Sequence, residues 1–229
     1  MAEKIKITAI EIYDKLLNEF KIQDQIGSVE IILGGISAKY YGRDAIGDLL
    51  QEWLGQWLRH NNYYYRTRVN TQEFPDFLLS EDDKSGFLEI KTFNANASPA
   101  FDIANFNSYS KSLLLKPERL DADYLILSYK MIDSILTIDN VWLKKVWEIS
   151  GVSGANPIVM QTKLKQPYNL RPLNWNTKNS KNKPFANKIE FLNAMVETHI
   201  KYAHHSESYS ENWLENVKAK YFENTGIKL

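Results

Sequence analysis

The sequence predicts a mixed α/β (α+β) fold with a mixed central sheet flanked by helices. Three features favour it. A long stretch with helical periodicity comes first, three strand-like runs follow it, and a continuous apolar run lies beyond a second helical stretch. Together they predict the order α-β-β-β-α-β between about residues 43 and 130.

The first element of that order is the clearest helix of the chain. In "GRDAIGDLLQEWLGQWLRHNN" the apolar residues trace a single helical face, which predicts a core helix over about residues 43–60. Those residues are Ile46, Leu49, Leu50, Trp53, Leu54, Trp57 and Leu58. Before it, we expect an amphipathic helix at 8–20 and a short strand at 29–33, which Gly34-Gly35 ends.

The three strand-like runs are "YYYRTRV" (63–69), "FPDFLL" (74–79) and "FLEIKTF" (87–93). Between the last two, "SEDDKSG" is a polar turn that ends in glycine, so these two runs predict an antiparallel hairpin. Ser98-Pro99 predicts the start of a helix that runs to about residue 115, and "DYLILSY" (123–129) predicts a buried strand.

The remainder of the chain predicts shorter elements. We expect strands near 134–138 and 157–164, and helices near 140–149, 186–202 and 211–222. A length of 229 residues fits one domain, 1–229, with its core at about 43–130.

Composition excludes several classes of protein. The absence of cysteine excludes a disulfide scaffold, a cysteine nucleophile and a Cys-ligated zinc site, and it fits a reducing cytoplasm. The charged N-terminal stretch has no signal-peptide core, and no apolar run approaches the ~20 residues that span a bilayer. We therefore expect a cytoplasmic protein that makes no use of a membrane.

Charge is balanced overall but unevenly distributed. Lys and Arg number 28, as do Asp and Glu, yet no acidic residue occurs between Ile149 and Ile189. Within that interval, "YNLRPLNWNTKNSKNKPF" mixes cations with aromatic and amide side chains. It is either a solvated lysine-rich loop or a strip that contacts phosphates and base edges.

The predicted hairpin carries the residues with the most chemistry. Side chains two apart on a strand share a face, so Glu89 and Lys91 point one way and Ile90 points the other. Asp76 lies on the neighbouring strand, within cross-strand or diagonal reach. Two close carboxylates repel each other unless a proton or cation lies between them, and Mg²⁺ prefers such oxygen ligands.

This pattern has two interpretations. In the first, Asp76, Glu89 and the backbone carbonyl of Ile90 bind a metal ion, and Lys91 orients a water, its role as a general base being left open. In the second, the charged side chains form only a structural ion network on the face of a sheet.

"FPDFLL…FLEIKTF", in its α-β-β-β-α-β setting, resembles the PD-(D/E)XK nuclease superfamily. Pro75-Asp76 and Glu89-Ile90-Lys91 match its signature residue by residue. The length and the basic C-terminal third are similar to those of a type II restriction endonuclease. "AIGDLLQEWLGQWL" and "YNLRPLNW" resemble the NgoBV/NlaIV group, which recognises GGNNCC.

The resemblance implies a restriction-endonuclease-like core and Mg²⁺-dependent, sequence-specific cleavage of double-stranded DNA to 5′-phosphate and 3′-hydroxyl ends. It also implies that Mn²⁺ substitutes for Mg²⁺, and that a cognate DNA methyltransferase belongs to the same restriction-modification system. A short palindromic target favours a homodimer. Two alternatives stay open: a repair or junction-resolving nuclease of the same superfamily, and a non-catalytic DNA-binding regulator.

In this superfamily the first core helix often supplies a further carboxylate in a G-x-x-x-E arrangement. Here Gly47 leads to Gln51, and Glu52 follows. Either Gln51 holds a metal-bound water or Glu52 replaces the missing acid. Asp48, away from the apolar stripe, is expected to be solvated.

DNA contacts are expected mainly from residues 131–229, which we assign to recognition and to C-terminal helices. Arg171 is the first candidate for reading a base, because a guanidinium fits the O6/N7 edge of guanine. Asn94, Asn96 and Ser98 are expected to contact the DNA backbone near the cut. The supporting candidates are Lys163, Lys165, Asn169, Asn174, Asn176, Lys178, Lys181 and Lys183.

Overall fold

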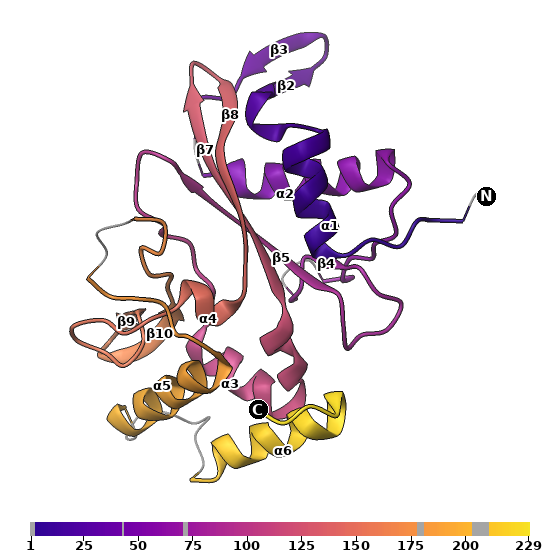
Figure 1. Ribbon diagram of the computed structural model, residues 1–229. Coiled ribbons are helices and arrows are strands. Elements are labelled where there is room, and N and C mark those ends of the chain that lie inside the picture. Colours follow the sequence, from indigo (N-terminus) through magenta and orange to yellow (C-terminus); the bar gives the residue numbers. More distant parts are fainter. Residues whose placement is uncertain (1–2, 43, 71–72, 178–180, 203–210) are drawn as a thin grey trace. The chain divides into compact units, whose positions relative to one another are not determined.

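The structure is a computed structural model that describes residues 3–42, 44–70, 73–177, 181–202 and 211–229 (Figure 1). The chain forms two compact units. The first comprises Met1–Ser98 and Asp123–Leu143, and the second comprises Pro99–Ala122 and Lys144–Leu229. Among the described residues, none of the helices has the length and apolar character needed to cross a membrane.

The first unit is built on a five-stranded mixed sheet with the strand order β1-β8-β7-β5-β4. Strands β5 and β7 are parallel, whereas β4 pairs with β5, and β1 with β8, in antiparallel fashion. The mixed α+β architecture is therefore as predicted. The strands are β1 (Ile26–Ser28), β4 (Phe77–Leu78), β5 (Phe87–Asn94), β7 (Asp123–Ile132) and β8 (Ile135–Lys144).

Two helices, α1 (Ala9–Asp14) and α2 (Ile46–His60), pack on one face of this sheet (Figure 1). Thr8 and Glu11 form a capping box that starts α1, and a π-helical turn, Lys15–Glu19, extends it over most of the predicted helix. A Cβ atom on Gly47 would lie only 3.2 Å from the Thr92 hydroxyl, so the glycine lets α2 approach β5 closely. The predicted helix at 43–60 is confirmed.

Three hairpins turn through two residues with positive φ. The pairs are Gly34-Gly35 between β2 (Glu30–Leu33) and β3 (Ile36–Lys39), Asp133-Ser134 between β7 and β8, and Leu164-Lys165 between β9 (Met160–Lys163) and β10 (Gln166–Leu170). This is the type I′ geometry that matches the twist of paired strands. The prediction takes Gly34-Gly35 only as the end of a strand and therefore lacks β3. The turn at Leu164-Lys165 has no glycine to signal it, so the prediction lacks β10 as well.

Three predicted elements need correction. Residues 63–69 form no strand; Arg66 makes a single bridge to Leu78, because β4 itself spans only two residues. The expected helix at 140–149 is reduced to α4 (Val146–Ile149), since β8 continues to Lys144 with Ile138 and Val141 in the core. The helix expected from Ser98 begins only at Phe106.

That late start has a local cause. The Asn105 side chain accepts a hydrogen bond from the backbone N–H of Ser108 at 3.0 Å and caps α3 (Phe106–Leu115). Before it, β6 (Ala104–Asn105) pairs with β10, so this segment is extended. The second unit thus contains the sheet β6-β10-β9 with α3, α4, α5 (Lys188–Lys201) and α6 (Trp213–Thr225).

The core of the second unit contains a buried histidine. His199 Nε2 lies 2.7 Å from the Ser110 hydroxyl oxygen, both side chains are fully buried, and the ring packs against Phe106 and Trp213. Burial lowers the pKa of His199 to about 4, so the folded protein holds it neutral. The unfolded chain binds a proton at about pH 6.5.

Stability should therefore fall as the pH drops from about 6.5 towards 4, because only the unfolded state gains the proton over that range. By pH 5 this one group is expected to lower the free energy of unfolding by about 2 kcal/mol relative to pH 7.5. Urea unfolding of the wild type and His199→Gln at both pH values measures the difference. The exposed His60, replaced in the same way, is the control; equal pH dependence for wild type and His199→Gln would contradict the prediction.

Candidate active site

Asp76 lies immediately before β4, and its side chain bonds to the backbone of the neighbouring strand β5. Its Oδ2 atom accepts a hydrogen bond from the backbone N–H of Ile90 at 2.7 Å. Because the N–H and C=O of one strand residue face the same side, the carbonyl of Ile90 is directed towards the same edge as Asp76. The Ile90 side chain points into the core, where it packs with Leu88 and Leu125.

Glu89 and Lys91 lie together on the opposite face of β5. The Nζ atom of Lys91 is 2.9 Å from Glu89 Oε1, and both side chains are largely buried. The other carboxylate oxygen of Glu89, Oε2, is buried and has no hydrogen-bond partner among the described residues. A buried, unpaired carboxylate oxygen is costly in free energy, which indicates that a further group belongs beside it.

The pKa of Asp76 also indicates that a further group belongs beside the two carboxylates. Burial, and after it the charge of Glu89, raise the pKa of Asp76 to about 7, although the N–H of Ile90 and the Lys91 ammonium oppose the shift. Two carboxylates are thus held close enough to repel each other, and the single ammonium group does not compensate for both. This arrangement favours a proton or a cation between them.

The donor set fits a hard divalent ion such as Mg²⁺. Mg²⁺ takes oxygen ligands, is commonly bound through only one or two carboxylates, and retains several waters. Asp76, Glu89 and the carbonyl of Ile90 supply such oxygens. In the part of the chain that the structure describes, no cluster of three or more His, Asp or Glu side chains has a metal-binding arrangement, so the two acids need the backbone carbonyl and water.

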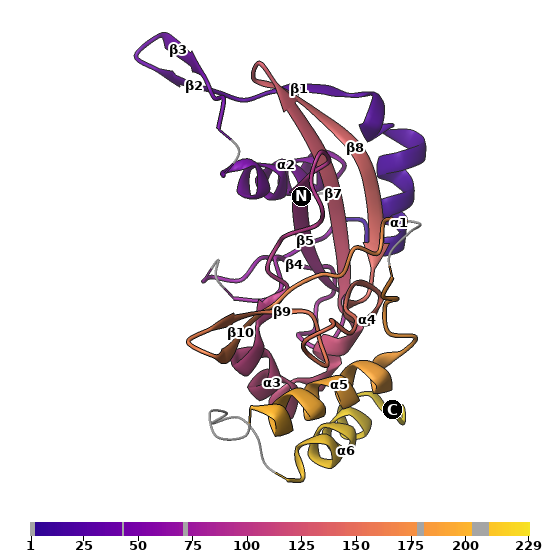
Figure 2. The ribbon, with the colours of Figure 1, turned by 90° about the vertical axis from the view of Figure 1, so that its left-hand side faces the viewer.

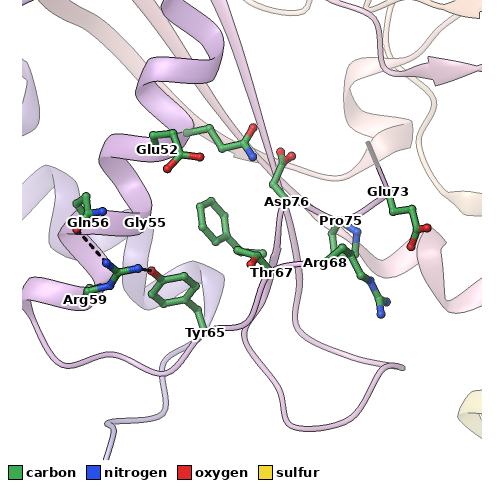
Figure 3. Close-up of a pocket in the computed structure, with 12 residues that line it drawn as sticks. Glu52, Gly55, Gln56, Arg59, Tyr65, Thr67, Arg68, Glu73, Pro75 and Asp76 are labelled. Atoms are coloured by element: carbon green, nitrogen blue, oxygen red, sulfur yellow. Dashed lines mark hydrogen bonds between the residues drawn. The ribbon is translucent and has the colours of Figure 1, made fainter. Parts of the chain in front are cut away.

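Asp76 also lines a pocket of about 200 Å³ beside helix α2 (Figure 3). Gln51 and Glu52, the two candidates from this helix, line the same pocket, Gln51 half-buried and Glu52 exposed. Figure 3 shows Glu52, Gln56 and Arg59 on the side of α2, with Pro75 and Asp76 facing them. Arg59 is fixed by hydrogen bonds to Gln56 and to the Tyr65 hydroxyl, at 3.4 and 3.2 Å.

A second acidic residue of α2 also lies near the site. Asp48, expected only to be solvated, is close enough for its charge to raise the pKa of Asp76. It lies on α2 one turn before Gln51 and Glu52. The G-x-x-x-E pattern does not identify Asp48, because the spacing from Gly47 leads to Gln51.

Asn94, Asn96 and Ser98 lie at the end of β5 and in the segment that follows. The side chain of Asn94 accepts a hydrogen bond from the backbone N–H of Asn96 at 2.9 Å, so it shapes this turn. Asn96 and Ser98 are exposed. All three residues therefore lie at or just beyond the end of the strand that carries Glu89 and Lys91.

The remaining DNA-binding candidates belong to the second unit. Arg171 is held by its own chain: its Nε is 2.7 Å from Asp102 Oδ1, and its Nη2 donates to Gln161 Oε1 at 3.2 Å. Asn169 also bonds to Asp102, at 2.8 Å. These contacts fix the guanidinium of Arg171 next to Asp102. To bind Arg171 through the same N–H groups, the edge of a base would have to replace Asp102.

The lysines and the other asparagines of this set that the structure describes are exposed. Lys163 is the last residue of β9 and Lys165 lies in the β9–β10 turn; the ammonium of Lys163 is 5.2 Å from the centre of the Tyr168 ring. Asn174, Asn176, Lys181 and Lys183 follow β10 as exposed residues. Lys178 lies outside the described residues.

Comparison with known proteins matches this arrangement to restriction enzymes. The chain is 43% identical over 197 residues to the type II restriction enzyme NlaIV of Neisseria lactamica, which covers 85% of this chain and 81% of that protein. It is 42% identical over 148 residues to the type II restriction enzyme NgoBV of Neisseria gonorrhoeae, covering 64% and 84%.

The fold agrees with these sequence matches. A solved structure titled NlaIV restriction endonuclease superposes with a TM-score of 0.92 at 37% identity, over 100% of this chain and 94% of that one. A model of the NgoBV restriction endonuclease family matches residues 6–229. The relatives thus favour a restriction enzyme over the two alternatives, and the chain belongs to the NgoBV restriction endonuclease family of type II restriction enzymes.

Proposed function

We propose that this restriction endonuclease hydrolyses phosphodiester bonds of double-stranded DNA with Mg²⁺ held by Asp76, Glu89 and the carbonyl of Ile90, leaving 5′-phosphate and 3′-hydroxyl ends. One observation carries the proposal: Glu89 Oε2 is buried without a hydrogen-bond partner in the described chain, beside an Asp76 whose pKa burial and Glu89 raise to about 7. A cation between the two carboxylates would stabilise the charged form of both acids. Mn²⁺ is expected to replace Mg²⁺, since it takes similar oxygen ligands.

When bound, Mg²⁺ supplies Lewis-acid stabilisation of the phosphate charge that develops during hydrolysis. The protein supplies position. Asp76 is fixed by the N–H of Ile90, and Glu89 is fixed by Lys91 at 2.9 Å, so neither carboxylate has to reorganise on binding. Lys91 donates its remaining N–H groups to the attacking water and orients it for in-line attack on phosphorus.

The further residues have supporting roles in this proposal. Gln51 and Glu52 line the pocket beside Asp76, and the charge of Asp48 raises the pKa of Asp76. All three hold water on the side of α2. Asn94, Asn96 and Ser98 contact the DNA backbone next to the cut. Arg171 reads a guanine once Asp102 is displaced, and the exposed lysines and asparagines after β9 contact phosphates.

The proposed setting is that of a restriction-modification system in the cytoplasm. A two-fold symmetric target matches a homodimer, with one active site for each DNA strand. A cognate DNA methyltransferase is expected to protect the host sites. The resemblance to the NgoBV/NlaIV group makes GGNNCC the first target to test.

Digestion of unmodified phage DNA tests this function. The purified protein with Mg²⁺ is expected to give discrete fragments, and sequencing of their ends should show one recurring site with a 5′-phosphate on each new end. The reaction should proceed with Mn²⁺ and stop with EDTA. Fragments with random ends, or discrete cleavage that continues in EDTA, would contradict the proposal.

A further inference from the structure

The β2–β3 hairpin of the first unit has one fully apolar face that the unit leaves exposed. Ile31 pairs with Ala38 and Leu33 with Ile36, and these cross-strand partners share a face. Ile31, Leu33 and Ile36 are 65%, 79% and 75% exposed. The opposite face is more polar, with the charged residues Glu30 and Lys39 opposite each other and Ile32 opposite Ser37.

This hairpin, called the arm below, is anchored to the described part of the first unit at its base. The backbone N–H of Tyr40 donates to the carbonyl of Val29 at 2.8 Å, and both side chains pack against the core. Beyond that point the arm extends away from α2 and the main sheet (Figures 1 and 2). A two-stranded hairpin alone is marginally stable, so an exposed aliphatic face on it favours a covering partner.

A groove next to the arm has matching character. It encloses about 410 Å³, and its lining includes Phe20, Ile26, Leu49, Trp53 and Leu136. Glu30, at the base of the arm, is its only charged lining residue. Ile26 and Leu49 are 77% and 41% exposed, so the groove is an open apolar surface in the described structure. Of the arm, only Glu30 at its base is among the described residues that line the groove.

We propose that the apolar face of the arm docks in this groove on a second copy of the chain, and that the exchange is reciprocal. A two-fold dimer uses one surface pair twice, and here both members of the pair lie on the same compact unit. The inference rests on the proposed function in one respect: a two-fold DNA target calls for two copies. It adds the surface that joins them.

The charge of the arm argues against DNA as the occupant. Its one acid, Glu30, and its one base, Lys39, are direct cross-strand partners, so the arm has no net charge to attract phosphates. Large aliphatic side chains offer nothing to a phosphodiester backbone. A second apolar surface is the complement they require.

Sedimentation velocity over a concentration series tests the docking without DNA. The wild type is expected to dimerise, and Ile31→Lys is expected to raise the dimer dissociation constant at least about tenfold. Ile32→Lys is the matched control, because Ile32 is 66% exposed on the adjacent position of the same strand but faces the polar side. It should change the dissociation constant less than about twofold.

Several results would overturn the inference: a monomeric wild type, equal effects of the two substitutions, or association only with another protein such as the methyltransferase. Circular dichroism and thermal melting establish that both variants are folded. Because cleavage is not the readout, a normal dimer that fails to cut DNA contradicts the proposed chemistry alone.

Disulfide trapping tests the arm-in-groove geometry and does not depend on a lysine variant. The chain has no cysteine, so a copy with Leu33→Cys can be mixed with a copy carrying Leu49→Cys. The mixed disulfide is expected to form at least about fivefold faster than with Ile10→Cys, a control position that is 62% exposed on α1. Equal rates, or crosslinks only between two Leu33→Cys copies, would overturn docking in the groove.

Discussion

Replacing Lys91 with alanine is expected to lower the rate of DNA cleavage roughly 10³-fold while specific binding to the target survives. The ammonium group lies beside the two carboxylates, 2.9 Å from Glu89, and it is the group we assign to the attacking water. Specific binding should survive because Lys91 is not among the residues proposed to contact the bases. Single-turnover cleavage and electrophoretic mobility shifts without divalent metal measure the two effects.

Lys84→Ala provides the matched control, since Lys84 is an exposed lysine in the turn of the same hairpin. Its cleavage rate should equal that of the wild type. If Lys91→Ala loses specific binding together with cleavage, or cleaves at the normal rate, the assignment of Lys91 to the water is wrong.

Asp76→Asn is expected to abolish cleavage, by at least about 10³-fold, and to stabilise the metal-free protein. The fold raises the pKa of Asp76 to about 7, so its charged form is disfavoured relative to the unfolded chain, and this penalty grows as the pH rises from about 4 to 7. Asparagine removes the charge but can still accept the hydrogen bond from Ile90. At pH 8 the metal-free variant should therefore melt several °C above the wild type, on a scale of roughly 2–4 °C per kcal/mol.

Thermal melting with and without Mg²⁺ completes the test. The wild type should gain stability from Mg²⁺, because the ion binds only the folded site, and Asp76→Asn should lose that gain. Asp82→Asn is the control: this carboxylate lies in the same hairpin, but hydrogen bonds from Lys84 and Ser85 lower its pKa. An unchanged Mg²⁺ response in Asp76→Asn would remove this residue from the metal site.

Several parts of the fold could be predicted because their signals are local. The apolar stripe of α2 has helical spacing, and its residues Leu50, Leu54 and Leu58 are buried as the pattern implies. The hairpin of β4 and β5 follows from a polar turn between apolar runs, and strand periodicity alone places Glu89 and Lys91 on one face. These features depend on neighbours a few residues apart.

Other features depend on partners far away in the sequence. The loss of the 63–69 strand reflects the two-residue length of β4. The extension of β8 to Lys144 reflects its pairing with the long strand β7, since β1 pairs only with residues 135–137. Neither pairing can be predicted from the residues of the segment itself. The turns at Asp133-Ser134 and Leu164-Lys165 lack glycine, so their positive φ values follow from the strands they join.

The helix, the hairpin and the acids and lysine of the site can be predicted from residue order, because side-chain chemistry and the helical and strand periods are local properties of the chain. How these groups meet depends on contacts between distant segments. The tertiary structure set Asp76 on the N–H of Ile90, left Glu89 Oε2 without a partner in the described chain and brought the charge of Asp48 to bear on Asp76. Strand register and helix approach fix such distances, and both are settled by packing between segments that are remote in sequence.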